Sequence, residues 1–173
     1  DDTKQDSFNM LQDSEIYFTG STKMDNGVTL SVTVQLEGDQ ARNGVIDESY
    51  MKLTGGFGDI RLGSVSGPVS TLKHTAPYVG FRLDGGDTNN YIQVPTNATA
   101  SASTNLAESG DAVKIVYISP VVAGGLRLGL GYTPSTVNAD TSPLLTGAAA
   151  DEQVYEASIS YEAKMGTSDV KLD

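Results

Sequence analysis

The main candidate for a functional site is one long segment, residues 65–111. It holds the charged and titratable residues Lys73, His74, Arg82, Asp84, Asp87, Glu108 and Asp111. His74 is the only histidine and there is no cysteine, so a transition-metal site is not expected and His74 is predicted to form loop hydrogen bonds. No nucleophile, base and orienting group stand out as a set, so the sequence does not predict an enzyme.

Asp84 and Asp87 flank two glycines, and carboxylates in such a turn could offer oxygen ligands to calcium at a loop. Two acidic residues at a glycine turn are more often only a turn, so we expect no cofactor. Unstructured segments as long as 65–111 are uncommon and are usually functional or disordered. Fixed charges at a narrow passage set ion preference. The alternative is that the segment is a solvated outer loop whose charges only aid solubility.

Eight runs have the pattern of β-strands: residues 14–20, 27–37, 45–54, 57–64, 112–119, 125–133, 152–163 and 168–173. Apolar and polar residues alternate in 28–37, 125–132 and 152–162, which gives each strand one aliphatic and one polar face. Helix signals are nearly absent. The pattern predicts an all-β antiparallel fold. Several runs approach the roughly 9–11 residues that a strand needs to cross a bilayer at a tilt.

The links between these runs alternate in length. The short links are 21–26, 55–56, 120–124 and 164–167, and the long ones are 38–44, 65–111 and 134–151. Because neighbouring strands run in opposite directions, all short turns fall at one end of the sheet and all long loops at the other. Outer-membrane β-barrels have this arrangement. A soluble sandwich has no reason to sort its loops by length.

Composition excludes several classes of function. The chain has 173 residues and a formal net charge of −11, which suits one domain over 1–173 and argues against nucleic acid as a partner. Mean hydropathy is −0.21, and no run approaches the roughly 18 apolar residues of a membrane helix. Neither observation excludes a membrane barrel, because half of each strand would face water.

Several segments carry a resemblance to a known family. They are 13–20 (DSEIYFTG), 25–30 (DNGVTL), 47–55 (DESYMKLTG), 57–63 (FGDIRLG), 116–120 (VYISP), 125–134 (GLRLGLGYTP) and 154–161 (VYEASISY). In their order and spacing the chain resembles Gram-negative porins, of the alphaproteobacterial Rhodobacter and Rhodospirillum type. The resemblance covers most of 13–173.

The resemblance implies an outer-membrane porin, a homotrimer in contact with outer-membrane lipid and lipopolysaccharide. Such a channel passes ions and small hydrophilic solutes by diffusion and catalyses nothing. Porins of this kind are closed barrels of about sixteen strands, so eight runs correspond to about half of a transmembrane β-barrel, and we expect the chain to be part of a longer one. The segment after 57–63 is expected to fold inward as the constriction loop over about 65–90, with plain loop over 91–110.

If the aliphatic faces look outward, the pore-facing residues are Glu15, Glu37, Asp59, Arg61, Lys114, Arg127, Glu156 and Glu162. Glu48 and Lys52 join them if Met51 and Leu53 face lipid, but the run 45–54 supports either register. With the loop residues, the predicted lining and constriction set is Asp59, Arg61, Lys73, His74, Arg82, Asp84, Asp87, Lys114, Arg127 and Glu156.

Arg61 and Arg127 are the candidates for a basic wall of the pore, or they form ion pairs that only brace the barrel. Acidic residues outnumber basic ones in the pore-facing set, which predicts a modest cation preference unless Lys73 and Arg82 in the loop override it.

Two other functions compete with a pore. The first is a soluble β-sandwich, a surface-layer or adhesion module that binds protein or glycan. The second is a β-rich hydrolase, which would need a clustered nucleophile and base, and the sequence shows no such cluster.

Overall fold

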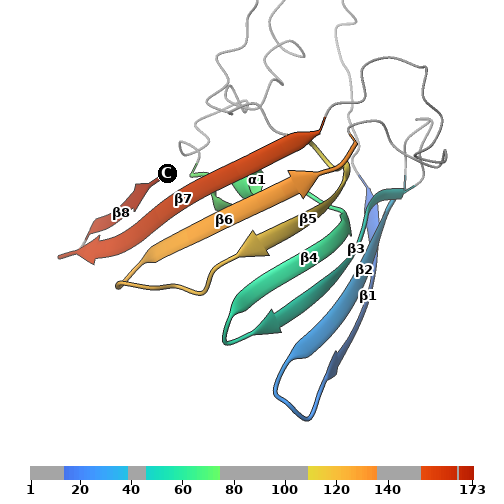
Figure 1. Cartoon of the computed structure of the whole chain (residues 1–173), viewed down its shortest axis with the longest axis horizontal. Coiled ribbons are helices and arrows are strands. Elements are labelled where there is room, and N and C mark those ends of the chain that lie inside the picture. The colour runs from blue at the N-terminus through green and yellow to red at the C-terminus, as the bar shows by residue number, and fades with distance from the viewer. Residues whose placement is uncertain (1–13, 39–45, 75–108, 136–152, 167) are drawn as a thin grey trace, which may run out of the picture.

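The computed structural model describes residues 14–38, 46–74, 109–135, 153–166 and 168–173. Within them, eight strands form one antiparallel sheet in sequence order (Figure 1). The strands are β1 (Glu15–Lys23), β2 (Thr29–Glu37), β3 (Ile46–Gly55), β4 (Gly58–Ser64), β5 (Val113–Ile118), β6 (Leu126–Thr133), β7 (Val154–Met165) and β8 (Ser168–Leu172). The predicted all-β antiparallel fold is confirmed. Among the described strands, β1 and β8 each pair on one side only, so the sheet is open.

One short helix, α1 (Pro68–Leu72), follows β4. In the part of the chain that the structure describes, no helix is long and apolar enough to cross a bilayer.

The first hairpin is tighter than the sequence predicts. β1 continues to Lys23, which pairs with Thr29 of β2. The turn between them closes through the amide of Met24, which donates to the carbonyl of Val28 at 2.8 Å. Gly27 takes a φ of 84°, a conformation that glycine adopts without steric cost. The tight turns of the sheet lie at one end (Figure 1).

The strand register decides which side chains share a face. Val32 lies opposite Met51, and Leu30 lies opposite Leu53. Since paired residues of neighbouring strands point to the same side, Met51 and Leu53 belong to the aliphatic face. Lys52 therefore lies on the polar face, which settles the register that the sequence left open.

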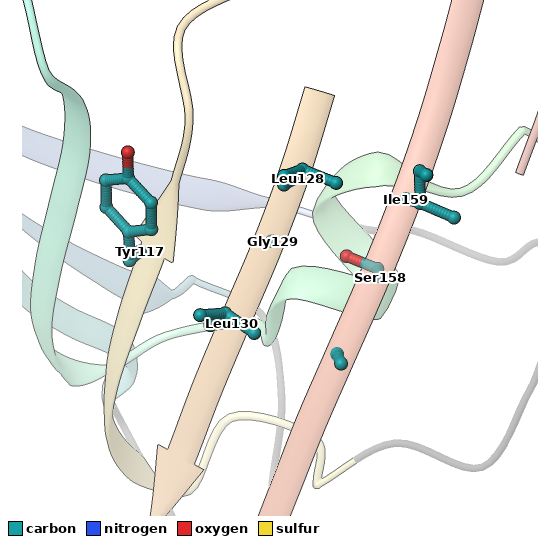
Figure 2. A pocket seen from close by; sticks show the side chains of 7 residues that line it. Tyr117, Leu128, Gly129, Leu130, Ser158 and Ile159 are labelled. Carbon is teal, nitrogen blue, oxygen red and sulfur yellow. The ribbon is translucent and has the colours of Figure 1, made fainter. Parts of the chain in front are cut away.

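The aliphatic face, called the outer face below, exposes large apolar side chains. Tyr117, Leu128, Leu130 and Ile159 line one shallow groove on it (Figure 2). Leu130 is 57% exposed and Ile159 is 55% exposed. Contiguous apolar surface of this kind marks a contact with a membrane or another protein.

The polar face, called the inner face below, is covered in part by α1, which packs against β5, β6 and β7 (Figure 1). Glycines of β6 form the seat of the helix. A β-carbon added at Gly131 would lie 2.7 Å from Cδ of Pro68, and one added at Gly129 would lie 2.7 Å from Cβ of Pro68. A small core forms beside this seat from Val65, Leu72, Val116 and Ile118. The absence of side chains on these glycines lets α1 lie directly on the sheet.

The assignment of faces predicts different surroundings for two adjacent residues of β2. Since the chain has no cysteine, the variants Val32→Cys and Thr33→Cys each carry one unique spin label. In lipid vesicles, oxygen dissolved in the lipid should relax the label at 32, and a water-soluble nickel complex should relax the label at 33. The opposite result would contradict the register.

Candidate functional site

The residues predicted to face a pore all lie on the inner face where the structure describes them. They are Glu15, Glu37, Glu48, Lys52, Asp59, Arg61, Lys114, Arg127, Glu156 and Glu162. Strand pairing brings them to the side on which α1 lies. Arg82 lies outside the described residues, and so does the turn at Asp84 and Asp87, at which we expect no cofactor.

Arg61 of β4 joins the sheet to α1. Its Nη1 donates to Oγ1 of Thr71 at 3.2 Å, and the Thr71 hydroxyl donates to the carbonyl of Gly67 at 2.9 Å. The neighbouring pore-facing residue of the same strand, Asp59, accepts a hydrogen bond from Oγ1 of Thr54 at 2.7 Å. The guanidinium therefore holds the helix as well as placing a positive charge on the inner face.

Lys114 and Glu156 lie on the predicted face but beneath the ends of the 65–111 segment. Lys114 is only 2% exposed and Glu156 only 8% exposed. The Lys114 ammonium donates to the carbonyl of Val65 at 2.8 Å and also to the carbonyl of Gly110. Oε2 of Glu156 accepts a hydrogen bond from Oγ of Ser109 at 2.7 Å. Neither charge stands freely on the surface of the inner face.

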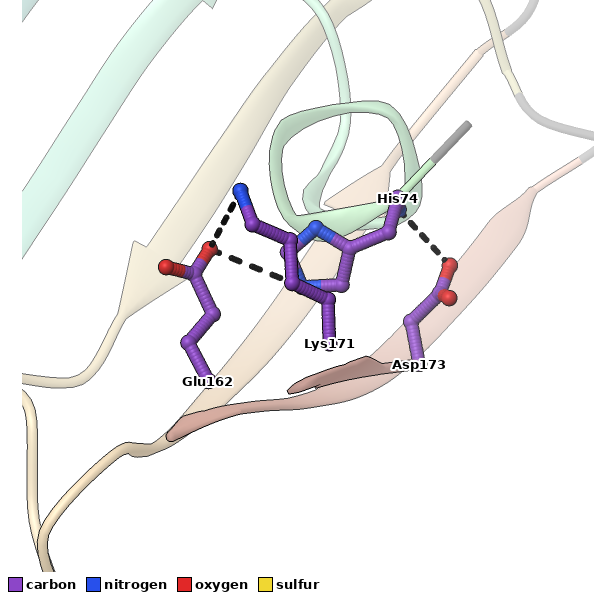
Figure 3. Close-up of polar contacts among 4 residues, drawn as sticks. All are labelled: His74, Glu162, Lys171 and Asp173. Carbon is purple, nitrogen blue, oxygen red and sulfur yellow. Dashed lines mark hydrogen bonds and ion pairs between the residues drawn. The ribbon is translucent and has the colours of Figure 1, made fainter. Parts of the chain in front are cut away.

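His74, just after α1, contacts Glu162 of β7 and Asp173, the residue that follows β8 (Figure 3). Its backbone amide donates to Oδ2 of Asp173 at 3.0 Å. Its Nε2 lies 3.6 Å from Oε1 of Glu162, and the same oxygen lies 3.9 Å from Nζ of Lys171. The adjacent Lys73 ends the helix, with its amide donating to the carbonyl of Val69 at 3.0 Å. The contacts of His74 join the C-terminal end of α1 to β7 and to the residue that follows β8.

Several small polar residues of the site were not singled out from the sequence. The backbone amide and the hydroxyl of Ser66 each donate to Oε1 of Glu48 at 3.0 Å. The same hydroxyl also lies 3.1 Å from Oδ1 of Asp111, and the hydroxyl of Ser158 donates to the carbonyl of Pro68 at 3.0 Å. Neither Ser66 nor Ser158 carries a local signal of its partner, because the partners lie 18 and 90 positions away.

An acidic cluster lies near one end of the first three strands. The carboxylates of Glu15, Glu37 and Asp47 approach within 4.8 Å of one another. Its side chains lie on exposed or half-buried positions of β1, β2 and β3. This cluster is formed by other residues than Asp84 and Asp87.

Comparison with known proteins supports the interpretation of the two-faced sheet. A sequence model of Gram-negative porins matches residues 1–172, almost the whole chain. A search of curated proteins found no match. The single antiparallel sheet, with one apolar face and one charged face, has the form of part of a porin β-barrel. The chain belongs to the Gram-negative porin family.

Proposed function

We propose that the complete protein is an outer-membrane channel through which ions and small hydrophilic solutes diffuse passively. The observation that carries this proposal is the sorting of side chains on one sheet, with charges and hydroxyls inside and exposed aliphatic side chains outside. In a porin barrel these faces would meet an aqueous lumen and lipid, respectively. The charges act by biasing permeation, and no reaction is catalysed.

The edges of the sheet support a larger barrel. Strands β1 and β8 each have a partner on one side only among the described strands. In a bilayer, unpaired backbone groups along such an edge would be strongly unfavourable. We therefore include further strands in the proposal, which close a barrel of about sixteen strands around an aqueous lumen.

The partners follow from the outer face. Its exposed side chains, such as Leu130 and Ile159, suit outer-membrane lipid and the acyl chains of lipopolysaccharide. We propose a homotrimer as the assembled form, in which part of this face is covered by neighbouring subunits. Chemical cross-linking of the protein in native membranes should give bands of the monomer, the dimer and the trimer, and no larger species. A monomer band alone would contradict the proposed homotrimer.

The complete, folded protein should conduct ions across a planar lipid bilayer. A water-filled lumen lined by the inner face gives discrete current steps, whereas heat-denatured protein at the same concentration should give none. Folded protein that inserts into the bilayer without raising its conductance would overturn the proposed function.

The inner face predicts a modest preference for cations. Lys114 and Glu156 are covered and have opposite charges, so they contribute little to selectivity. Among the other residues predicted to face the pore, the acidic ones, Glu15, Glu37, Glu48, Asp59 and Glu162, outnumber the basic ones, Lys52, Arg61 and Arg127. Acidic linings favour cations, and higher salt weakens the preference by screening.

Reversal potentials under a potassium chloride gradient measure this preference. The variant Arg61→Gln should raise it and Asp59→Asn should lower it, since each removes one charge from β4. A clear anion preference of the unmodified channel would show that positive charges elsewhere in the pore dominate.

A further inference from the structure

Two stretches of chain that are far apart in the sequence meet at the inner wall beside α1. The hydroxyl of Ser66 lies 3.1 Å from a carboxylate oxygen of Asp111. These stretches, 65–68 and 109–111, are the two ends of the long segment between β4 and β5. Their contacts close the base of that segment against the sheet.

The ammonium of Lys114 binds both ends at once. It donates to the carbonyl of Val65 on one side and to the carbonyl of Gly110 on the other. Burial of a charged amine is unfavourable unless hydrogen bonds compensate it, and these two carbonyls supply that compensation. Both acceptors belong to the ends of the segment and neither to the strand ladder. The side chain therefore joins the segment to the wall.

Glu156 of β7 also contacts both ends of the segment. One carboxylate oxygen accepts the hydrogen bond from Ser109 at 2.7 Å. Both oxygens also lie against the other end, because a β-carbon added at Gly67 would be 2.6 Å from each of them. The carboxylate thus occupies the space between Gly67 and Ser109 and contacts both ends of the segment.

We propose that Lys114 and Glu156 are positioning residues that fix α1 on the inner wall by clamping both ends of the segment that carries it. The helix begins at Pro68, directly after Gly67, so displacement of the clamp frees its N-terminal end. Resting on the proposed function, the inference extends to permeation: these two charges act on the pore through the position of α1, and they do not bind the permeating ions.

A spin label on α1 tests the clamp without requiring any current. The variant Ser70→Cys carries the only thiol of the chain, and its label should be immobile in otherwise unmodified protein. Lys114→Met removes the ammonium and keeps the aliphatic stem. Loss of its two charge-assisted hydrogen bonds should raise the mobile fraction of the label roughly tenfold or more. Glu156→Gln, which removes the charge and keeps the shape, should raise it by a smaller factor.

Lys164→Met is the matched control. Lys164 lies on the inner side of β7 like Glu156, but its partner is Asp169 at 3.8 Å and its side chain is 84% exposed. Its loss should leave the label immobile. Circular dichroism should show the same β-sheet content in all three variants. If Lys114→Met does not fold, Glu156→Gln provides the test.

Current recordings add the functional consequence. Both clamp variants should show more frequent closures and greater open-channel noise than unmodified protein, and Lys164→Met should not. A label that stays immobile in the folded clamp variants would overturn the inference. A protein that never conducts would overturn the proposed function instead, and the label would still report on the clamp.

Discussion

Replacing Gly58 with alanine should lower the free energy of unfolding by about 4 kcal/mol or more, an exceptionally large effect for one methyl group. Gly58 opens β4 with a φ of 104°, in a region that other residues rarely adopt. An added β-carbon would lie 2.1 Å from the carbonyl oxygen of Ile118 and 2.9 Å from the nitrogen of Pro120. Both atoms belong to the backbone of the neighbouring strand and its turn, so relief requires separation of β4 from β5.

The same turn offers a matched control. Gly56 lies two positions earlier, and a β-carbon there would meet nothing within 4 Å. Gly56→Ala should therefore unfold like the unmodified protein. Urea unfolding in lipid vesicles, followed by circular dichroism, compares the two variants. Equal unfolding midpoints for Gly58→Ala and Gly56→Ala would contradict the close packing of this turn on β5.

Strands and faces could be predicted from the sequence because the information is local. Alternation in β2, β6 and β7 marks each strand and its two faces within about ten residues. The faces of β3 cannot be assigned from alternation, because its apolar residues occupy both odd and even positions. The register between β2 and β3 also shifts between Val34 and Leu36. Only the pairing of Met51 and Leu53 with their neighbours decides the face.

The helix α1 could not be predicted because little of its stability is local. It has five residues, and so short a helix is marginal without tertiary contacts. Its position comes from the seat at Gly129 and Gly131 and from the hydrogen bond to Arg61. The two glycines are recognisable in the sequence as small inner-face residues, but what they accommodate lies about sixty positions earlier, at Pro68.

In the candidate site, too, the face of each strand residue could be predicted from the sequence, but its hydrogen-bond partners could not. Strand parity placed Lys114 and Glu156 on the inner face correctly, because parity depends only on position within a strand. Parity says nothing about what covers a side chain. The partners of these two residues, Val65 and Ser109, lie 49 and 47 positions away, in segments whose course no local pattern specifies.

Filling the seat of α1 should narrow the channel. In Gly131→Val the new β-carbon would start 2.7 Å from Cδ of Pro68, and the branched methyl groups need further space. The wall strand is held by pairing on both sides, so the short helix moves away from the inner face, which in the proposed channel is toward the lumen. Overpacking of this kind costs about 1–3 kcal/mol. The variant should fold with reduced stability and show a lower single-channel conductance.

Gly20→Val is the control, because it tests whether a valine in place of any strand glycine lowers the single-channel conductance. Gly20 lies on β1, where an added β-carbon would meet nothing within 4 Å, and it points to the outer face beside Val32. Its conductance should equal that of the unmodified channel, and Gly131→Ala should fall between the two valine variants. An unchanged or higher conductance of folded Gly131→Val would mean that α1 does not border the permeation path. The charges of Arg61 and the loop would then have to influence permeation without the helix.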